Sequence, residues 1–285
     1  SYANRLKKGD SEKEIRNHAF RRAFLLLLFG WALYCIDPEK IIFQFDNVLA
    51  QLSFTYLLAF IVVKKTPMLQ AVLALVCIVV SDLLYRFFPV VDFDQAFVAG
   101  QNFGAWFNIF ISGYEYGGHW AAFNTVPTAA HTIWGLMAGQ LLMSTSTNTE
   151  KLKRLIIAAL ICLAFGYTVS IFTPVIKRIT TTSFIFLSGG WTILALAVCY
   201  WVIDIKSYIK KTLVFTVVGV NPLFIYLFAS VGGGDLFQKI AKPFTNTFIG
   251  VFFPWLASFI LGLIVLFCLW YVCYWLYQKQ IFIKI

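Results

Sequence analysis

The chain has 285 residues, of which 60% are hydrophobic and only 13% are charged, and it contains 30 Phe and 9 Trp. A soluble domain of this length does not need so much apolar surface, so the composition excludes that class and indicates a membrane protein. Runs such as FLLLLFGWALYCI do not alternate between polar and apolar residues, which argues against a transmembrane β-barrel. We therefore expect an all-α, polytopic transmembrane helix bundle.

Eight segments are apolar over about the 20 residues that a helix needs to cross a bilayer core. In chain order they cover residues 19–36, 47–63, 67–88, 121–143, 152–172, 183–204, 211–231 and 249–277. Most of the 23 Lys and Arg residues fall on one side of this arrangement, which predicts that both termini are cytoplasmic. The formal net charge of +10 then reflects topology and a match to anionic lipid head groups. The lipid bilayer is the expected partner, and no nucleic-acid partner is expected.

The six cysteines lie inside the apolar segments, without a CxxC pair and without His or acidic residues at metal-ligand spacing. We interpret them as small buried apolar side chains, and we expect neither a disulfide framework nor a metal site. The Walker A, GxGxxG, HExxH and GxSxG signatures do not occur in the sequence. Nucleotide-binding and hydrolase functions of those classes are therefore not indicated.

Residues 89–120 form the longest expected connection between spans, and they contain Glu115 and His119 but no Lys or Arg. Residues 103–111 place aromatic and aliphatic side chains on one helical face, which predicts a short helix lying in the membrane interface. Long ordered loops often carry function, so this segment is either part of a site or an aromatic anchor.

The fourth apolar segment carries polar residues that are costly on a lipid-facing surface. At 100° per residue, one helical face collects Asn124, Thr128, His131, Gly135 and Gly139. Because unpaired polar groups are costly in lipid, this face is predicted to line a hydrated cavity. The two glycines also have the spacing that lets two helices approach closely. His131 has either a direct chemical role or only a hydrogen bond to a neighbouring backbone carbonyl.

Two further segments interrupt the apolar pattern. Pro222 kinks its helix, and Asn221 puts an amide at about mid-membrane, so this pair is either a ligand-binding device or a kink held across the bundle. Lys177 and Arg178 break the positive-inside pattern on the outer side, just before a polar run that ends at Ser183. Two cations beside a helix N-terminus would hold an anionic or polyhydroxylated group.

Five segments occur in a characteristic order along nearly the whole chain. They are NVLAQLSFTYLLAF, NTVPTAAHTIWGLMAGQLL, PVIKRITTTSFIFLSGGWTILALAVCYWVID, VGVNPLFIYLF and YQKQIFIKI. This ordered set resembles the heparan-alpha-glucosaminide N-acetyltransferase family and its bacterial relatives. No single motif among them is highly specific, but their order is.

The resemblance implies a transmembrane acyltransferase of a bacterial cytoplasmic membrane. Such an enzyme takes acetyl-CoA from the cytoplasmic side and acetylates an amino sugar or glycan on the other side. Asn221 matches a G-x-N-P or G-x-N-S segment of the family, and Thr125 matches a T-I-P segment. Lys177 and Ser183 match a polar stretch before the following span. We expect His119 or His131 near the chemistry, and substrate binding by Asn124, Thr125, Thr128, Lys177, Ser183 and Asn221.

The chain departs from the family pattern at two places that would help to shape the pocket. Ala50 and Gln51 replace a Gln-Arg pair, and YGGHWAAF replaces an acidic D-P-E-G segment. In the family, two further spans come first and carry an R-G motif and the catalytic-base histidine, and SYANRLKK resembles the tail of the second. We therefore expect one domain over residues 1–285 that lacks two N-terminal spans, with about ten spans in the whole protein.

Other function classes stay open. A transporter or flippase for a sugar or an amphipathic metabolite would use the same broken helices as its substrate site, although no internal repeat relates the two halves. A structural membrane subunit would need no polar cluster at mid-membrane. The sequence is also compatible with a homodimer.

Overall fold

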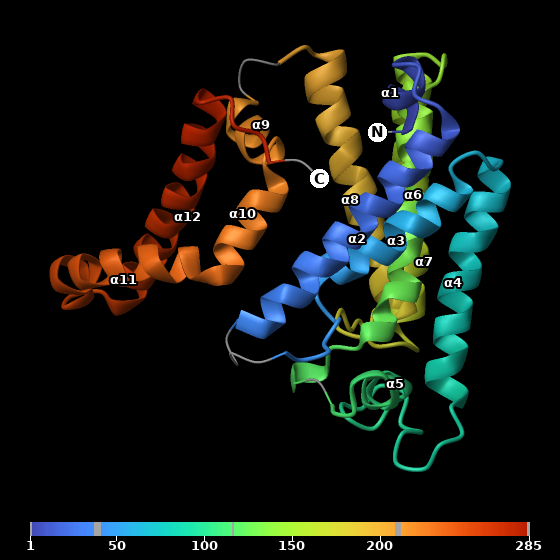
Figure 1. Cartoon of the computed structure of the whole chain (residues 1–285), viewed down its shortest axis with the longest axis horizontal. Helices are drawn as coiled ribbons and strands as arrows, with labels where there is room; N and C mark the ends of the chain where they lie inside the picture. The colour runs from blue at the N-terminus through green and yellow to red at the C-terminus, as the bar shows by residue number, and fades with distance from the viewer. Residues whose placement is uncertain (1, 37–40, 116, 209–211, 284–285) are drawn as a thin grey trace. The chain divides into compact units, whose positions relative to one another are not determined.

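The computed structural model describes residues 2–36, 41–115, 117–208 and 212–283, and every regular element within these ranges is helical (Figure 1). The expected all-α class is therefore confirmed for the described residues. The chain folds into two compact units, Ser1–Ile205 and Lys206–Ile285. The expectation of a single domain that lacks two N-terminal spans stays a prediction.

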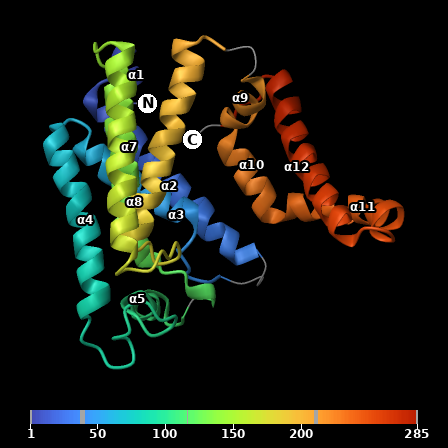
Figure 2. The same cartoon turned by 180° about the vertical axis from the view of Figure 1, so that it is seen from behind.

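The N-terminal unit is a bundle built around α6. Its helices are α1 (Tyr2–Lys7), α2 (Glu12–Ile36), α3 (Val48–Val62), α4 (Pro67–Phe87), α5 (Phe103–Ser112), α6 (Thr125–Met143), α7 (Asn148–Ser170) and α8 (Thr182–Tyr200). Helix α6 packs against α3, α4 and α8, while α7 and α8 form an antiparallel pair (Figure 2). The helical turns Gly117–His119 and Ala122–Asn124 lead into α6, and Trp201–Ile205 continues α8.

Short polar side chains start several of these helices. Asn47, Thr66, Asn102 and Thr147 precede α3, α4, α5 and α7, and each accepts a hydrogen bond from the backbone N–H three residues further on. Each bond satisfies one of the N–H groups that a helix leaves unpaired at its start. The Asn47 amide also donates to the Gly30 carbonyl of α2 over 2.5 Å, so this cap joins two helices.

Aliphatic side chains from four helices form the centre of the N-terminal unit. They are Val62 of α3, Ala74 and Ile78 of α4, Ala130 and Ile133 of α6, and Ile185 of α8. Full burial of a Val or Ile side chain stabilises the fold by about 1.5–3 kcal/mol. This cluster therefore determines which face of α6 points inward. The face of α6 that carries His131 is thereby turned toward α8 and the loop before it.

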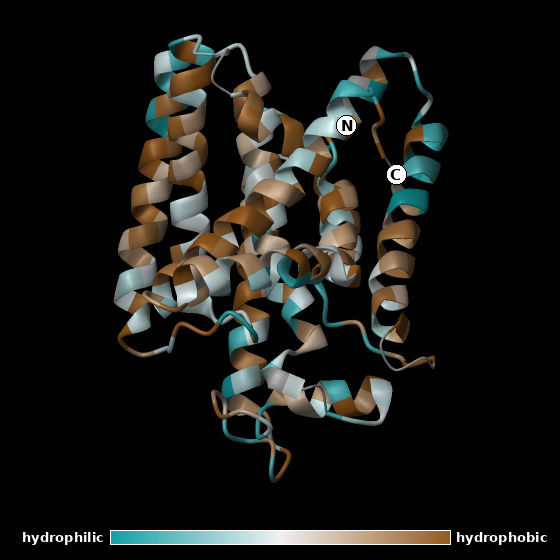
Figure 3. Cartoon of the chain, turned by 90° about the vertical axis from the view of Figure 1, so that its left-hand side faces the viewer, coloured by the Kyte–Doolittle hydropathy of each residue, from teal (hydrophilic) through white to brown (hydrophobic). Residues whose placement is uncertain are grey.

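Helix α5 lies across one end of the unit instead of along the long helices (Figure 3). Phe103 packs its ring against Tyr85, Phe88 and Phe123, at centroid distances of 5.6, 4.9 and 4.7 Å. The buried Asn108 accepts a hydrogen bond from the N–H of Ala122 over 2.9 Å. The helix predicted over residues 103–111 is therefore confirmed, and its position in the membrane interface stays a prediction.

Asp82 and Arg86 lie four residues apart on α4, a spacing that predicts an ion pair. The pair is present, with Arg86 Nε 2.6 Å from Asp82 Oδ2. Arg86 also donates to Thr173 Oγ1, and Thr182 Oγ1 donates to Asp82 Oδ1 over 3.0 Å. This network ties α4 to the loop at residues 171–181 and to the start of α8.

The C-terminal unit contains a broken helix followed by a long one. Its elements are α9 (Leu213–Gly219), α10 (Pro222–Phe228), the turn Ala229–Gly233, α11 (Gly234–Thr245), the turn Asn246–Gly250 and α12 (Pro254–Gln278). The chain bends by 74° between Gly219 and Pro222, as the proline predicted. Trp270 Nε1 donates to the Val214 carbonyl over 3.0 Å and so joins α12 to α9. Lys211, at the start of the seventh expected span, lies outside the described residues.

Within the described ranges, five helices are long and apolar enough to cross a membrane, namely α2, α4, α7, residues 182–205 and α12. The bent pair of Leu213–Gly219 with Pro222–Gly250 would make a sixth. The chain is therefore a helical integral membrane protein, but the count of eight spans is not confirmed. Helix α3 has 15 residues, which at 1.5 Å per residue gives about 22 Å and falls short of a core of about 30 Å. Helix α6 is long enough to cross a membrane, but its polar residues make it too hydrophilic to count among the five spanning helices.

Candidate functional site

A cavity of about 410 Å³ lies beside the polar face of α6 in the N-terminal unit. Asn124, Thr128, His131 and Gly135 line it, as their helical spacing predicted, whereas Gly139 does not. The rest of its wall includes Gln51 of α3, Trp120, Lys177 and Thr180 from the loops, and Trp134, Phe184, Ser188, Gly189 and Thr192 from α6 and α8. We call it the histidine cavity.

The imidazole of His131 is held by α8 through one ring nitrogen. Its Nε2 lies 2.9 Å from the Ile185 carbonyl and 3.1 Å from Ser188 Oγ. A carbonyl only accepts, and the Ser188 hydroxyl donates to the Phe184 carbonyl over 2.6 Å, so both neighbours of Nε2 are acceptors. The proton of a neutral imidazole therefore sits on Nε2, and Nδ1 keeps a lone pair. No other described residue forms a hydrogen bond with the ring.

Aromatic rings and a glycine contact enclose this imidazole. The Trp134 and Phe184 rings approach it edge-on, at centroid distances of 5.8 and 6.3 Å. Gly189 of α8 lets Trp134 come close, because a Cβ at residue 189 would lie 2.5 Å from Trp134 Cζ3 and 3.3 Å from His131 Cδ2. The close helix approach predicted for Gly135 and Gly139 is wrong within this unit. A Cβ built at either one meets nothing within 4 Å.

Asn124 joins three parts of the cavity wall. Its side chain is fully buried, accepts a hydrogen bond from Gln51 Nε2 of α3, and donates to the Arg178 carbonyl over 3.1 Å. The backbone N–H of Ala121 donates to the same carbonyl over 3.4 Å. Because one amide holds α3, the start of α6 and the loop before α8, it positions the cavity in addition to lining it.

Lys177 supplies the positive charge of the histidine cavity. Its Nζ lies 5.8 Å from the centroid of the Trp120 ring, in a cation–π arrangement. Among the described residues, no carboxylate forms an ion pair with Lys177. The next turn of the loop ends at Thr180, which has a φ of 53° and lines the same cavity. An ammonium without a carboxylate partner is available to an anionic or hydroxyl-bearing ligand.

Three of the predicted site residues in the N-terminal unit do not line this cavity. His119 is exposed and borders a separate small hollow with Glu115. Thr125 lines an apolar cavity with Phe54, Phe107 and Phe123. Ser183 is buried, and its hydroxyl donates to the Pro174 carbonyl over 3.0 Å, so it holds the loop in place. Their predicted roles in binding or catalysis stay predictions.

Asn221 lies in the C-terminal unit and holds the last described residues of the chain. Its Nδ2 donates to the Ile281 carbonyl, and its Oδ1 accepts from the Ile283 N–H, each over 2.9 Å. The side chain is fully buried. Asn221 therefore has the role that was expected as the alternative to ligand binding, which is to hold its kinked helix to another segment by hydrogen bonds. Its predicted contact with a substrate stays a prediction.

Asn221→Ala is expected to release the segment at residues 281–283. The substitution removes two partly buried hydrogen bonds, each worth about 0.5–1.5 kcal/mol, so amide exchange of Ile283 should accelerate by about tenfold. Hydrogen exchange read by mass spectrometry of the C-terminal peptide would measure this change. Asn246→Ala, which removes an exposed amide from the same unit, is the matched control. Equal exchange in both variants would contradict the bonding role.

The cysteines form no pairs. All six are free; Cys273 is buried, Cys199 is exposed and the others are half-buried. The interpretation of all six as buried apolar side chains therefore holds only in part. Within the described ranges, no three His, Cys, Asp or Glu side chains are grouped so that they could hold a metal ion.

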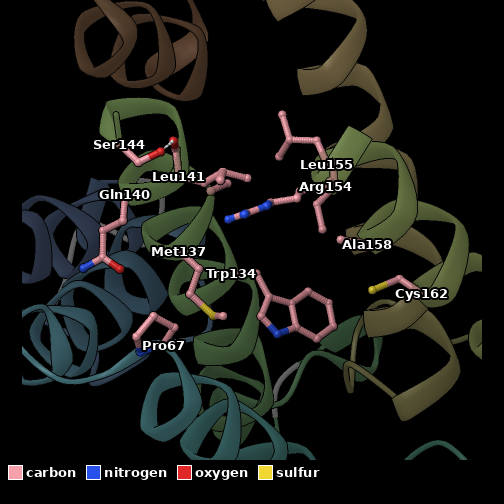
Figure 4. Close-up of a pocket in the computed structure, with 12 residues that line it drawn as sticks. Pro67, Trp134, Met137, Gln140, Leu141, Ser144, Arg154, Leu155, Ala158 and Cys162 are labelled. Atoms are coloured by element: carbon pink, nitrogen blue, oxygen red, sulfur yellow. Dashed lines mark hydrogen bonds between the residues drawn. The ribbon is translucent and has the colours of Figure 1, made fainter. Parts of the chain in front are cut away.

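A second cavity of about 530 Å³ lies between α4, α6, α7 and α8 (Figure 4). Arg154 is its only charged lining residue among those described, and we call it the arginine cavity. Trp134, Ala138 and Ile193 line both cavities, so these three side chains form a shared wall. No sequence signal indicated this cavity, because its apolar lining has the composition of an ordinary helix interface.

No protein-family model matches the chain, and no curated protein matches it. The resemblance to the heparan-alpha-glucosaminide N-acetyltransferase family therefore remains a prediction from the ordered motifs. The geometry of the histidine cavity is the independent basis for a functional proposal.

Proposed function

We propose that this protein is a membrane-embedded acyltransferase that moves an acetyl group from cytoplasmic acetyl-CoA to the amine or hydroxyl of an amino sugar or glycan. The observation that supports it best is that one cavity contains both an imidazole with a free Nδ1 lone pair and an ammonium without a carboxylate partner. Acyl transfer needs both a base and an electrostatic partner for oxygen.

In the proposed reaction, Nδ1 of His131 accepts the proton of the acceptor N–H or O–H while that atom attacks the thioester carbonyl. The new N–C or O–C bond forms and the C–S bond breaks. The departing CoA thiolate takes the proton back from the imidazolium. The Ile185 carbonyl keeps the ring oriented and its Nε2 protonated throughout, as an orienting acceptor does in other His-based sites.

Lys177 and Thr128 are the proposed substrate-binding groups of this cavity. The ammonium would stabilise negative charge on the acceptor or on the developing thioester oxyanion, and the Trp120 ring beside it would cover an apolar face of the ligand. The Asn124 amide, which is already engaged by Gln51 and Arg178, would act by holding the wall in place.

A transporter of a sugar or amphipathic metabolite is the second candidate. The 74° break at Asn221–Pro222 favours it, because discontinuous helices form substrate sites in many transporters. The two proposals differ in what happens to the substrate. Purified protein in proteoliposomes should transfer label from acetyl-CoA to glucosamine if the first is correct. Counter-flow of labelled glucosamine without acetylation would instead support the second and contradict the first.

A further inference from the structure

We propose that the arginine cavity binds an anionic phospholipid, with its phosphate on Arg154 and one acyl chain in the apolar part of the cavity. This site is distinct from the histidine cavity and does not depend on the chemistry proposed there. Three features of the cavity carry the proposal: the available cation, the order of polar and apolar lining residues, and its place in the predicted topology.

The guanidinium of Arg154 is available for a ligand. The side chain extends from α7 into the space beside Met137 and Leu141 of α6 (Figure 4). Within the described ranges it forms no ion pair or hydrogen bond, and Glu150, one turn earlier on α7, does not pair with it. A planar guanidinium binds phosphate oxygens through two parallel N–H donors, which makes a phosphate its best complement.

The lining of the cavity changes from polar to apolar along its length. Arg154, Gln140 and Ser144 lie toward one end, whereas Ala158 and Cys162 follow Arg154 along α7. From Arg154 to Cys162 the helix rises by roughly 12 Å, at 1.5 Å per residue. A ligand that fits must therefore carry its charge at one end of an apolar body. The volume of about 530 Å³ falls within the range of about 300–1,000 Å³ that small-molecule pockets have.

The polar end lies beside the turn between α6 and α7, which the positive-inside pattern places in the cytoplasm. Anionic lipids concentrate in the cytoplasmic leaflet, and basic pockets between membrane helices on that side bind their head groups. Lys151 is also in this turn, but its Nζ donates to the Leu142 carbonyl over 2.8 Å. Arg154 is consequently the cation that the cavity itself presents to a head group.

The test uses purified protein in detergent and two lipids with dibrominated acyl chains, phosphatidylglycerol and phosphatidylcholine. Bromine quenches tryptophan fluorescence at contact, and Trp134 lines the apolar end of the cavity. The Trp134 signal is obtained as the difference between the wild type and Trp134→Phe. We expect phosphatidylglycerol to quench this signal at a concentration about tenfold below that of phosphatidylcholine, the size expected for a charge-assisted phosphate contact.

Arg154→Gln should remove the preference for phosphatidylglycerol, and Arg154→Lys should keep part of it. Lys153→Gln is the matched control, because Lys153 is exposed on the same turn and does not line the cavity. Native mass spectrometry of retained phosphatidylglycerol in the same variants checks the result without using the Trp134→Phe difference. Equal quenching by both lipids, or an equal loss in Lys153→Gln and Arg154→Gln, would overturn the proposal.

Discussion

His131→Ala is expected to lower the rate of acetyl transfer by about 10²–10⁴-fold, the contribution that a positioned general base makes. The substitution removes the Nδ1 lone pair that receives the acceptor proton. It should leave the fold intact, because the Ile185 carbonyl lies within α8 and keeps its helical partner. The measurement is the initial rate of label transfer from acetyl-CoA to glucosamine in proteoliposomes, with thermal unfolding in detergent as the check on folding.

His119→Ala is the control for this experiment, because His119 is exposed and borders a different hollow. Its rate should stay close to that of the wild type. Ser188→Ala should cost less than His131→Ala, since Ser188 only shares the Nε2 proton that the Ile185 carbonyl already accepts. A large loss in His119→Ala together with normal turnover by His131→Ala would move the base to the segment before α6.

Gly189→Ala is expected to destabilise the protein by about 1–3 kcal/mol, the usual cost of extra atoms in a packed interior. A methyl group at residue 189 would lie 2.5 Å from Trp134 Cζ3, well inside contact distance, and would press on His131 as well. Trp134 packs against the central aliphatic cluster and against the Phe186 ring at 5.4 Å, so it has little room to move. The thermal unfolding midpoint in detergent would measure the loss.

Gly135→Ala, on the facing helix α6, is expected to stabilise the protein instead. A Cβ at residue 135 meets nothing within 4 Å, and replacing a helical glycine by alanine stabilises by up to about 1 kcal/mol. The two variants add the same methyl group to neighbouring helices, so they should shift the midpoint in opposite directions. Stabilisation by both would show that Trp134 adjusts to the added group, and destabilisation by both would contradict the open space at residue 135.

The helix positions could be predicted from the sequence because apolar runs are long and their starts carry capping residues. The expected segments at residues 67–88 and 47–63 correspond to α4 and α3, with Thr66 and Asn47 as caps. The kink at Pro222 was also predictable from the missing N–H. The span count was not, because a helix as short as α3 or as polar as α6 can be placed in a bundle by its neighbours.

From the sequence, only the part of the site that lies on a single helix could be predicted. The shared face of Thr128 and His131 on α6, and of Asn124 just before it, follows from a period of 3.6 residues. The partner of His131 does not, because Ser188 is 57 residues away and the contact depends on how α8 packs. The glycines show the same limit. Spacing pointed to Gly135 and Gly139, whereas beside His131 the close contact is made by Gly189 with a tryptophan of α6. Gly166 and Gly190 make the close contacts between α7 and α8.

The central claim is that the histidine cavity holds the acceptor during acyl transfer, and filling that cavity tests it most directly. Gly135→Leu places a side chain into open space on the cavity wall, so the protein should fold normally while transfer to glucosamine falls by about 10²-fold. Gly139→Leu adds the same side chain one turn further along α6, outside the cavity lining, and should keep its rate within about twofold. Wild-type transfer by a folded Gly135→Leu protein would contradict the claim.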